Sequence, residues 1–432
     1  MKFGKSLLAV SVAAIALTGC NANQTKEASP EYVTKHAVLE TYANIAEAKY
    51  EDSLITAKQL QQTVEAFLAQ PTEANLKAAR DAWVAARAPY QQTEAYRFGN
   101  AIVDDWEGRV NAWPLDEGLI DYVASDYGTE SDENSLYAAN VVANKMLKIG
   151  GTTVDASVIT KSLLADTLQE ADEVEANVAT GYHAIEFLLW GQDLNGTAPG
   201  AGNRPATDFS LTDCSNGNCD RRRAYLQVAT DLLIDDLQEM ANNWKQNGDA
   251  RAELFGKGIN GGLSTILTGM GSLSYGELAG ERTKLGLMLH DPEEEHDCFS
   301  DNTHYSHYYD AKGIKNVYLG EYKRVDGSVV SGPSLSDLLA QTAPKIDAQL
   351  KAELNSTETA MQAMVDAAEK GQTFDVLIGE NNTAGNALVQ ASVDALTTQT
   401  KSIEMAITAL NLDGIELEGS DSLDNPQAVL AE

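Results

Sequence analysis

Apolar residues recur at helical spacing along most of this chain. In residues 30–69, a stretch rich in Ala, Leu, Glu and Lys, Val33, Leu39 and Tyr42 follow this spacing, and Pro71 comes soon after. The pattern predicts a helix that ends just before the proline. Similar patterns predict helices over residues 72–98, 134–149, 155–172, 175–190, 221–247, 250–271, 273–288, 334–370 and 384–410.

Other segments break the helical pattern. Residues 193–220 are rich in Gly, Asn, Pro and Thr, which predicts a long surface loop. Residues 290–313 are polar and aromatic without periodicity. Residues 318–330 alternate around Asp326-Gly327, which is typical of a β-hairpin.

The predicted elements describe an all-α protein made of two antiparallel helical bundles, with a short hairpin and long loops at the second domain. We place the first domain at residues 31–218 and the second at residues 219–412. Residues 413–432 are acidic, and we expect them to form a loose tail.

The first residues predict export and a lipid anchor. Lys2 and Lys5 precede an apolar stretch at residues 7–17 that is too short to span a bilayer. The Leu17-Thr18-Gly19-Cys20 sequence that follows resembles the bacterial lipobox, so we expect a signal peptide over residues 1–20, acyl chains on Cys20 and a flexible tether over residues 21–30. By resemblance to sorting rules, Asn21 favours the outer membrane, facing the periplasm. The alternative is an ordinary secretory signal that is cut nearby.

The net charge of the chain narrows the possible binding partners. The formal net charge of −33 argues against nucleic acid as a partner. This charge fits a well-solvated surface, or the attraction of cations.

Cys214 and Cys219 flank a turn-like linker and, in an oxidising compartment, predict a small disulfide-closed loop. A metal knuckle is the alternative, although a second pair of ligands is missing nearby. We expect Cys298 to be unpaired and buried.

The segment 181–191 contains the most informative polar pair. His183 and Glu186 are three residues apart, so they are neighbours on a helix, and Trp190 shares their face. A carboxylate in such an apolar helix needs a partner, which a metal ion or an arginine would supply. The alternative is a structural His–Glu pair. Neither form of the zincin motif is present, so any peptidase role for Glu186 would need ligands from elsewhere in the chain.

A second set of candidate metal ligands lies further along the chain. Four of the six histidines fall between His290 and His307, within an acidic segment. Imidazole together with carboxylate suits zinc, iron or copper better than calcium or magnesium. We expect further metal ligands to complete the site of His183 and Glu186, and the candidates are Glu277, Glu281, His296 and Asp301. The alternative is a solvated, charged loop.

A polar and aromatic stripe on the second predicted helix supplies candidates for a ligand cleft. Trp83, Arg87, Tyr90 and Glu94 are spaced four, three and four residues apart and share one face. With Trp190 they could line a cleft, or they could form a seam of ion pairs between helices.

These segments together resemble the imelysin-like family. The resemblance rests on Gly181-x-His183-x-x-Glu186, on the string from Glu295 to His304 and on Trp113-Pro114-Leu115-Asp116, and it covers residues 32–410. The string that ends at His304 resembles the iron-regulated branch of the family.

The resemblance implies a site near the junction of two helical bundles, an envelope location and a link to iron acquisition. The leading hypothesis is an anchored protein that binds a divalent metal, iron in preference to zinc, or an iron-bearing ligand, and supports uptake by a membrane transporter or receptor. One alternative is a metallopeptidase, the activity for which the family is named. The other is a metal-free scaffold that binds a partner protein.

Overall fold

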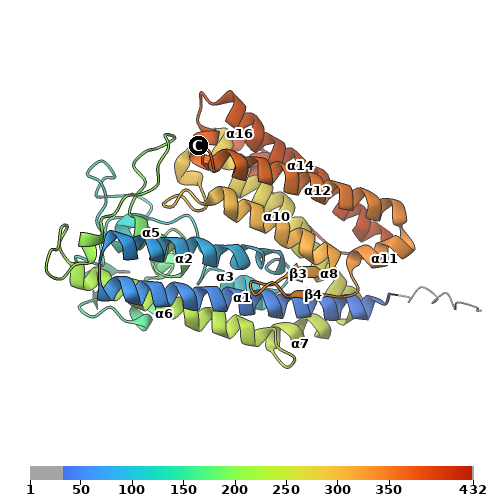
Figure 1. The fold of residues 1–432 in the computed structure, drawn as a ribbon, viewed down its shortest axis with the longest axis horizontal. Coiled ribbons are helices and arrows are strands. Elements are labelled where there is room, and N and C mark those ends of the chain that lie inside the picture. Colours follow the sequence, from blue (N-terminus) through green and yellow to red (C-terminus); the bar gives the residue numbers. More distant parts are fainter. Residues whose placement is uncertain (1–32, 431–432) are drawn as a thin grey trace, which may run out of the picture. The chain divides into compact units, whose positions relative to one another are not determined.

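Helices form most of residues 33–430, the part of the chain that the computed structural model describes (Figure 1). Helix α1 (Lys35–Ala69) begins at Thr34, whose hydroxyl accepts a hydrogen bond from the backbone N–H of Ala37 at 3.1 Å. It ends before Pro71, as predicted. A link of three residues then leads into α2 (Glu73–Gln91), which lies beside α1.

Helix α1 is also flanked by helices from later in the chain. It packs along α6 (Cys219–Asn243) and touches α8 (Gly258–Ser272). Helix α7 (Asp249–Gly256) lies between α6 and α8 in the sequence. The predicted domain boundary at residue 218 separates α1 from α6, so the packing of these two helices crosses it.

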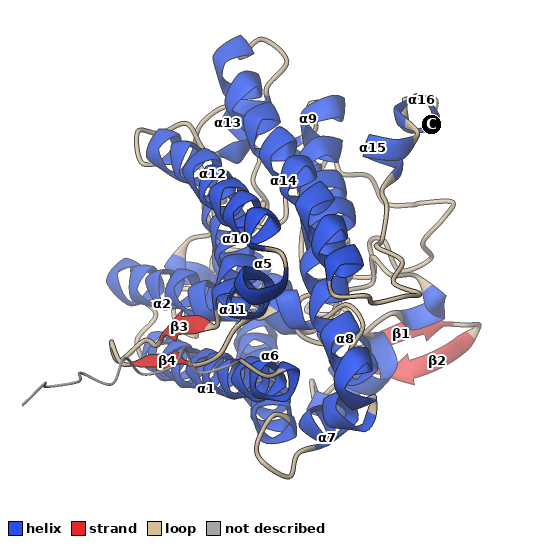
Figure 2. Ribbon diagram, turned by 90° about the vertical axis from the view of Figure 1, so that its right-hand side faces the viewer, coloured by secondary structure: helices blue, strands red, loops and turns tan. Residues whose placement is uncertain are grey.

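The second group of helices comes from the C-terminal half of the chain. Helix α14 (Thr383–Ala409) packs against α12 (Pro344–Ala368) and against the π-helix η5 (Leu273–Leu285), and α10 (Thr303–Leu319) packs against α12 and α2. Figure 2 shows α10, α12 and α14 as neighbours. The predicted all-α class is confirmed.

The remaining helices are short. They are η1 (Glu94–Tyr96), α3 (Ala101–Glu107), α4 (Glu117–Ile120), η2 (Leu163–Leu168), η3 (Ala171–Glu173), α5 (Gly181–Trp190), η4 (Ala206–Phe209), α9 (Gly286–Leu289), η6 (Pro292–Glu294), α11 (Leu335–Thr342), α13 (Phe374–Ile378), α15 (Asp421–Asp424) and α16 (Pro426–Val429).

Two antiparallel strand pairs interrupt the helices. Strands β3 (Glu321–Lys323) and β4 (Val329–Ser331) form the predicted hairpin. Strands β1 (Met146–Ile149) and β2 (Thr152–Asp155) form another one, where a helix over residues 134–149 was predicted wrongly. Gly150 and Gly151 between them have φ values of +54° and +77°, which favour glycine and reverse the chain.

Two further predictions need correction. The segment 290–313 is not irregular throughout, because α10 begins at Thr303. Of the helix predicted over residues 155–172, the structure keeps only the short helices η2 and η3.

The acidic tail is also more ordered than predicted. Residues 417–420 lie against α8 and η5, where Gly271, Gly276 and Gly280 leave room for them. Helix α15 packs on η5. A Cβ on Gly280 would meet the Cβ of Ser420 at 2.2 Å. The hydroxyl of Tyr275 donates a hydrogen bond to Oδ1 of Asp424 at 2.7 Å. The glycines on α8 and η5 therefore allow the C-terminal segment to pack closely against these helices.

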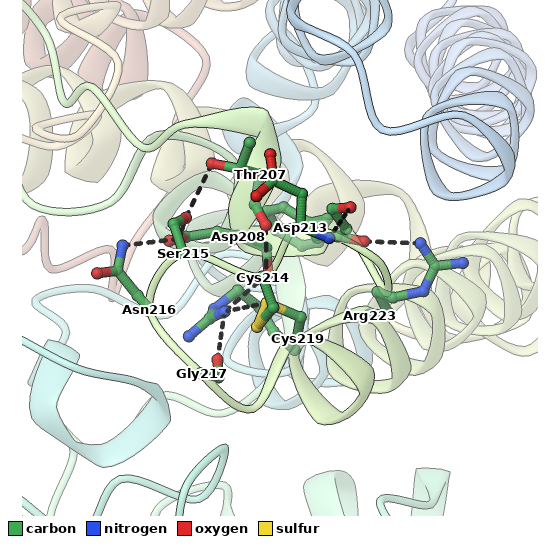
Figure 3. The surroundings of a disulfide bond; sticks show 12 residues. Thr207, Asp208, Asp213, Cys214, Ser215, Asn216, Gly217, Cys219 and Arg223 are labelled. Atoms are coloured by element: carbon green, nitrogen blue, oxygen red, sulfur yellow. Dashed lines mark hydrogen bonds between the residues drawn. A yellow bond between two sulfur atoms is a disulfide. The ribbon is translucent and has the colours of Figure 1, made fainter.

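Cys214 and Cys219 form a disulfide that closes the loop before α6 (Figure 3). Within this loop, the side chains of Ser215 and Asn216 each donate a hydrogen bond to the buried Asp208 at 2.7 Å. Cys298 is unpaired within residues 33–430 and half-buried, where full burial was predicted.

No helix within residues 33–430 is both long and apolar enough to cross a bilayer. The predicted signal peptide, Cys20 and the tether over residues 21–30 lie outside the described residues.

Candidate functional site

The site is built around α5, a short helix whose residues are all buried. The helix begins at Gly181, which has φ +78° and lies so close to Val110 that a Cβ would come within 2.4 Å of its carbonyl oxygen. The next N–H, that of Tyr182, donates a hydrogen bond to the same oxygen at 2.8 Å. Glycine is therefore needed at the first position of the motif, where it sets the position of the histidine that follows.

His183 and Glu186 contact one another on this helix. Nδ1 of His183 lies 2.9 Å from Oε2 of Glu186, and both side chains are buried. The other carboxylate oxygen, Oε1, accepts hydrogen bonds from the backbone N–H and the hydroxyl of Ser300, at 3.0 and 2.7 Å. Burial and the charge of Asp297 raise the pKa of Glu186. Nε2 of His183 is buried and has no hydrogen-bond partner among the described residues.

A second histidine reaches the first one from the segment before α10. The ring centroids of His183 and His296 are 4.9 Å apart, with the planes at 71°. The side-chain nitrogens of Gln91 and Arg87 lie 3.3 and 3.4 Å from Nδ1 of His296. The indole of Trp113 packs edge-on against the same ring. Two imidazoles from distant parts of the chain thus share one site.

Asp297 adds a carboxylate beside the two rings. One side-chain atom each of His183, His296 and Asp297 lies within 4.8 Å of the others. Asp297 also forms a buried ion pair with Arg87, at 2.7 Å, and accepts hydrogen bonds from Asn302 and Ser306. Although burial favours its neutral form, the positive charge of Arg87 lowers the pKa of Asp297 to about 2. The carboxylate is therefore ionised at neutral pH.

The two imidazoles are neutral. Burial and the positive charge of Arg87 lower the pKa of His183 to about 3. Burial, with Arg282 and His183 as further causes, lowers the pKa of His296 well below its ordinary value. A neutral imidazole offers one lone pair, which a metal ion or a hydrogen-bond donor can take.

A cavity of about 450 Å³ adjoins the site. His183 and His296 are part of its lining, together with four aromatic side chains, Trp113, Tyr127, Tyr137 and Phe299. Four carboxylic acids also line it, namely Asp116, Glu117, Asp126 and Glu293. The lining contains neither lysine nor arginine, so the cavity is suited to a cation.

The other predicted ligands lie apart from this cavity. Glu277 pairs with Arg282 at 2.7 Å and with Arg97 at 3.5 Å. Glu281 lines a separate cavity of about 750 Å³ next to the tail. Asp301 lies beside Asp193 and Asp375, with one oxygen of each within 4.8 Å of the others. Of the predicted metal ligands, the structure brings together His183, Glu186 and His296.

The side chains of the polar and aromatic stripe are buried. The guanidinium carbon of Arg87 lies 5.4 Å from the ring centre of Trp83 and 5.6 Å from that of Tyr90. Glu94 forms an ion pair with Arg282 at 2.8 Å. Trp190 packs on Trp83 and lines a neighbouring cavity of about 300 Å³. None of the stripe's side chains is among those that line the cavity of the two histidines.

The sequence analysis missed three contributors to the site. Asp297, Ser300 and Gln91 contact the two histidines or Glu186, as described above. Asp297 and Ser300 fall within the string from Glu295 to His304, and that string was the available signal. Gln91 lies one residue after Tyr90, and no pattern singles it out.

Comparisons with known proteins identify the family. The sequence profile of imelysin, peptidase M75, matches residues 46–403. A protein named iron-regulated protein A from Synechococcus elongatus is 26% identical over 325 residues, which cover 72% of this chain and 71% of that protein.

Two solved structures share the fold. An iron-regulated protein A precursor from Parabacteroides distasonis has a TM-score of 0.62 at 17% identity, over 88% of this chain and 97% of that one. An imelysin-like protein from Psychrobacter arcticum has a TM-score of 0.55 at 16% identity, over 88% of this chain and 98% of that one. The chain therefore belongs to the imelysin family.

Proposed function

We propose that this protein binds a divalent metal ion, iron in preference to zinc, through His183 and His296, and that it supports iron uptake in the cell envelope. One observation carries the proposal. Nε2 of His183 is buried without a hydrogen-bond partner among the described residues, on a ring whose Nδ1 contacts a carboxylate. Leaving such an atom unpaired is costly, and a metal ion would satisfy it.

Glu186 fits the role of a residue that orients His183 better than the role of a ligand. Metal-binding histidines usually donate their second N–H to a carboxylate, which fixes the ring and makes it more basic. Both oxygens of Glu186 are engaged, by His183 and by Ser300. A metal on Nε2 would favour the ionised form of Glu186, despite the burial that raises its pKa.

His296 needs two changes to act as a ligand through Nε2. Nδ1, which also lies 3.4 Å from a nitrogen of Arg87, must carry its proton toward Oδ1 of Asp297, and the amide of Gln91 must turn. As placed, the amide nitrogen of Gln91 faces Nδ1 of His296, and Oε1 of Gln91 is buried without a partner. Amide orientation is inferred from the hydrogen-bond network. Reversing the amide lets Oε1 accept from Nδ1–H of His296 and frees Nε2 for a metal.

The donor set favours iron. Two histidines and one carboxylate with open positions are typical of non-haem ferrous sites, and Asp297 is close enough to be the carboxylate. The relative from Synechococcus elongatus is named as iron-regulated, which supports the same metal. When bound, the metal would supply positive charge in an acidic cavity, where His183 and His296 would hold it.

Titration of the purified protein with Fe(II), without oxygen, and with Zn(II) tests the proposal. We expect one site that prefers Fe(II), weakened at least tenfold in a His183→Gln, His296→Gln variant. His36→Gln, a change of an exposed histidine on α1, is the matched control and should bind as the parent does. Equal binding by the parent and the double variant would contradict the proposal. Absence of metal binding would favour the metal-free scaffold.

Anchoring through Cys20 belongs to the same proposal, because a lipid would keep the metal site beside a membrane partner. Stable anchoring takes more than one acyl chain, so we expect several on Cys20. A Cys20→Ser form should appear in the soluble fraction, and full retention on membranes after a salt wash would contradict the anchor.

A peptidase role finds less support. A general base must reach the attacking water, but Glu186 is fully buried and both of its oxygens are engaged. Metal-dependent cleavage that survives repurification and disappears in Glu186→Gln would favour the peptidase instead.

A further inference from the structure

Three aspartates from distant parts of the chain meet outside the histidine site. Asp193 lies in the loop after α5, Asp301 lies shortly before α10, and Asp375 is on the first turn of α13. One carboxylate oxygen of each lies within 4.8 Å of the other two. We call this group the aspartate cluster.

The cluster contains a buried carboxylate that lacks a regular hydrogen bond within the described chain. Asp375 is only 1% exposed, and neither of its side-chain oxygens makes a hydrogen bond of normal length and angle within residues 33–430. The hydroxyl of Thr373 and the N–H of Val376 nevertheless lie close enough to oppose the rise in its pKa that burial causes. Oδ1 of Asp301, which is 8% exposed, is also without a donor there. The charges that act most strongly on these two groups are those of other aspartates. A buried carboxylate without compensation is unfavourable, which favours either a bound cation or protonation.

A small cavity adjoins the cluster and is rich in oxygen. Its volume is about 10 Å³, and its lining includes Asp193 and Asp375 together with Glu117, Glu293 and Glu295. Such a volume holds about one water-sized species. Oε1 of Glu295 is also buried without a partner among the described residues. The cavity thus has room for one ion, surrounded by carboxylate oxygens.

We propose that Asp193, Asp301 and Asp375 bind a hard divalent cation, with Ca²⁺ as the best fit, at a second metal site made of oxygen ligands only. Hard cations prefer oxygen, and Ca²⁺ accepts six to eight oxygen ligands in flexible geometry. Mg²⁺ fits less well because it keeps several waters, for which a cavity of this size has little room. The cluster contains no imidazole, and Cys298, which also lines the small cavity, has a pKa raised by burial and stays a neutral thiol. The site therefore differs from the histidine site in metal preference.

The site would tie the segment that carries His296 to the rest of the fold. Asp301 follows His296 by five residues, and Asp193 follows Trp190, the last residue of α5, by three. A cation held by these residues and by Asp375 on α13 would link the two segments that carry the histidines. The expected effect is a calcium-dependent gain in stability.

The test is a Ca²⁺ and Mg²⁺ titration of the purified, EDTA-treated protein by calorimetry, with Tm measured in parallel. We expect one Ca²⁺ per chain, weaker Mg²⁺ binding and a Tm that rises with Ca²⁺. Asp375→Asn and Asp301→Asn should each weaken Ca²⁺ at least tenfold. In the absence of calcium, the Tm of each variant should be no lower than that of the parent, because the substitution removes a buried charge. That result shows that the loss of binding does not come from misfolding.

Two controls make the outcome specific. Asp366→Asn, an exposed carboxylate on α12, should leave Ca²⁺ binding unchanged. The His183→Gln, His296→Gln variant should keep the full calcium response, which separates failure here from failure of the histidine site. No Ca²⁺ or Mg²⁺ binding by the parent would overturn the proposal and mean that protons neutralise the cluster. Undiminished binding by Asp375→Asn would overturn it as well.

Discussion

Nδ1 of His183 lies 2.9 Å from Oε2 of Glu186, while Nε2 of the same ring is left without a partner among the described residues. The contact assigns the two ring nitrogens different roles. Nδ1 holds the ring in place, and Nε2 is available to a ligand. Ser300 extends the arrangement, because its N–H and hydroxyl both donate to the far oxygen of Glu186.

If Glu186 orients His183, its removal should weaken metal binding without abolishing it. Loss of such an outer partner typically costs 10- to 100-fold in metal affinity. We therefore expect Glu186→Gln to bind Fe(II) about 10- to 100-fold more weakly than the parent, and Ser300→Ala to show a smaller loss. Calorimetric titration measures both. An affinity unchanged in Glu186→Gln would argue against the orienting role.

The ion pair between Arg87 and Asp297 should be important for stability. Both side chains are buried, so Arg87→Met leaves an ionised carboxylate without its cationic partner. We expect a loss of about 3–5 kcal/mol in the free energy of unfolding, measured with urea. Adding Asp297→Asn should recover part of the loss.

An exposed ion pair serves as the control for this measurement. Lys77 and Asp81 pair on the surface of α2. Lys77→Met should therefore change the stability by less than about 0.5 kcal/mol. Similar losses at the two sites would contradict the importance assigned to burial.

Each buried histidine should make the stability of the protein sensitive to acid. Burial lowers the pKa of His183 and His307 to about 3 and that of His304 to about 4, against an ordinary value of 6.5. Below pH 6.5 the unfolded chain therefore holds protons on these histidines that the folded chain does not. The stability that each histidine contributes is fully present above pH 6.5 and should fall by about 1.4 kcal/mol per pH unit on the way to pH 4. Buried carboxylates with a raised pKa, such as Glu107 and Glu293 at about 7, act in the opposite direction.

Urea unfolding at a series of pH values measures this dependence. His307→Gln should reduce the slope by about one proton, whereas His36→Gln, at an exposed position, should leave it unchanged. Equal slopes for the parent and His307→Gln would contradict the account.

The C-terminal segment should depend on glycine at position 280. A methyl group there would collide with Ser420, so Gly280→Ala should displace residues 417–430 and destabilise the chain by about 1–3 kcal/mol. Limited proteolysis should then cut this segment sooner than in the parent. Gly256→Ala, where a methyl group meets nothing within 4 Å, is the control. Equal cleavage of both variants would contradict the role of the small residues.

Hydrophobic periodicity predicted the long helices but failed where helices bury polar groups. Helix α10 was missed because its buried face carries His304, Ser306, His307 and Asp310, which give no apolar pattern. The hairpin of β1 and β2 was missed because residues 146–149 were assigned to the helix predicted over residues 134–149, which ends just before Gly150 and Gly151.

The candidate site was predictable only where it depends on the spacing of residues along one helix. The spacing of His183 and Glu186 on one helix made their contact predictable. The approach of His296 depends on the path of the chain before α10, and local spacing does not contain that path. Glu277 was a plausible ligand until the structure placed Arg282 and Arg97 against it.

The most direct test of the proposed metal site is anomalous diffraction at the iron absorption edge, from crystals of the protein grown with Fe(II) in the absence of oxygen. We predict a peak about 2.0–2.3 Å from Nε2 of His183 and in contact with His296, a distance range typical of metal–imidazole bonds. Iron peaks that all lie away from His183, or confined to the aspartate cluster, would contradict the central claim.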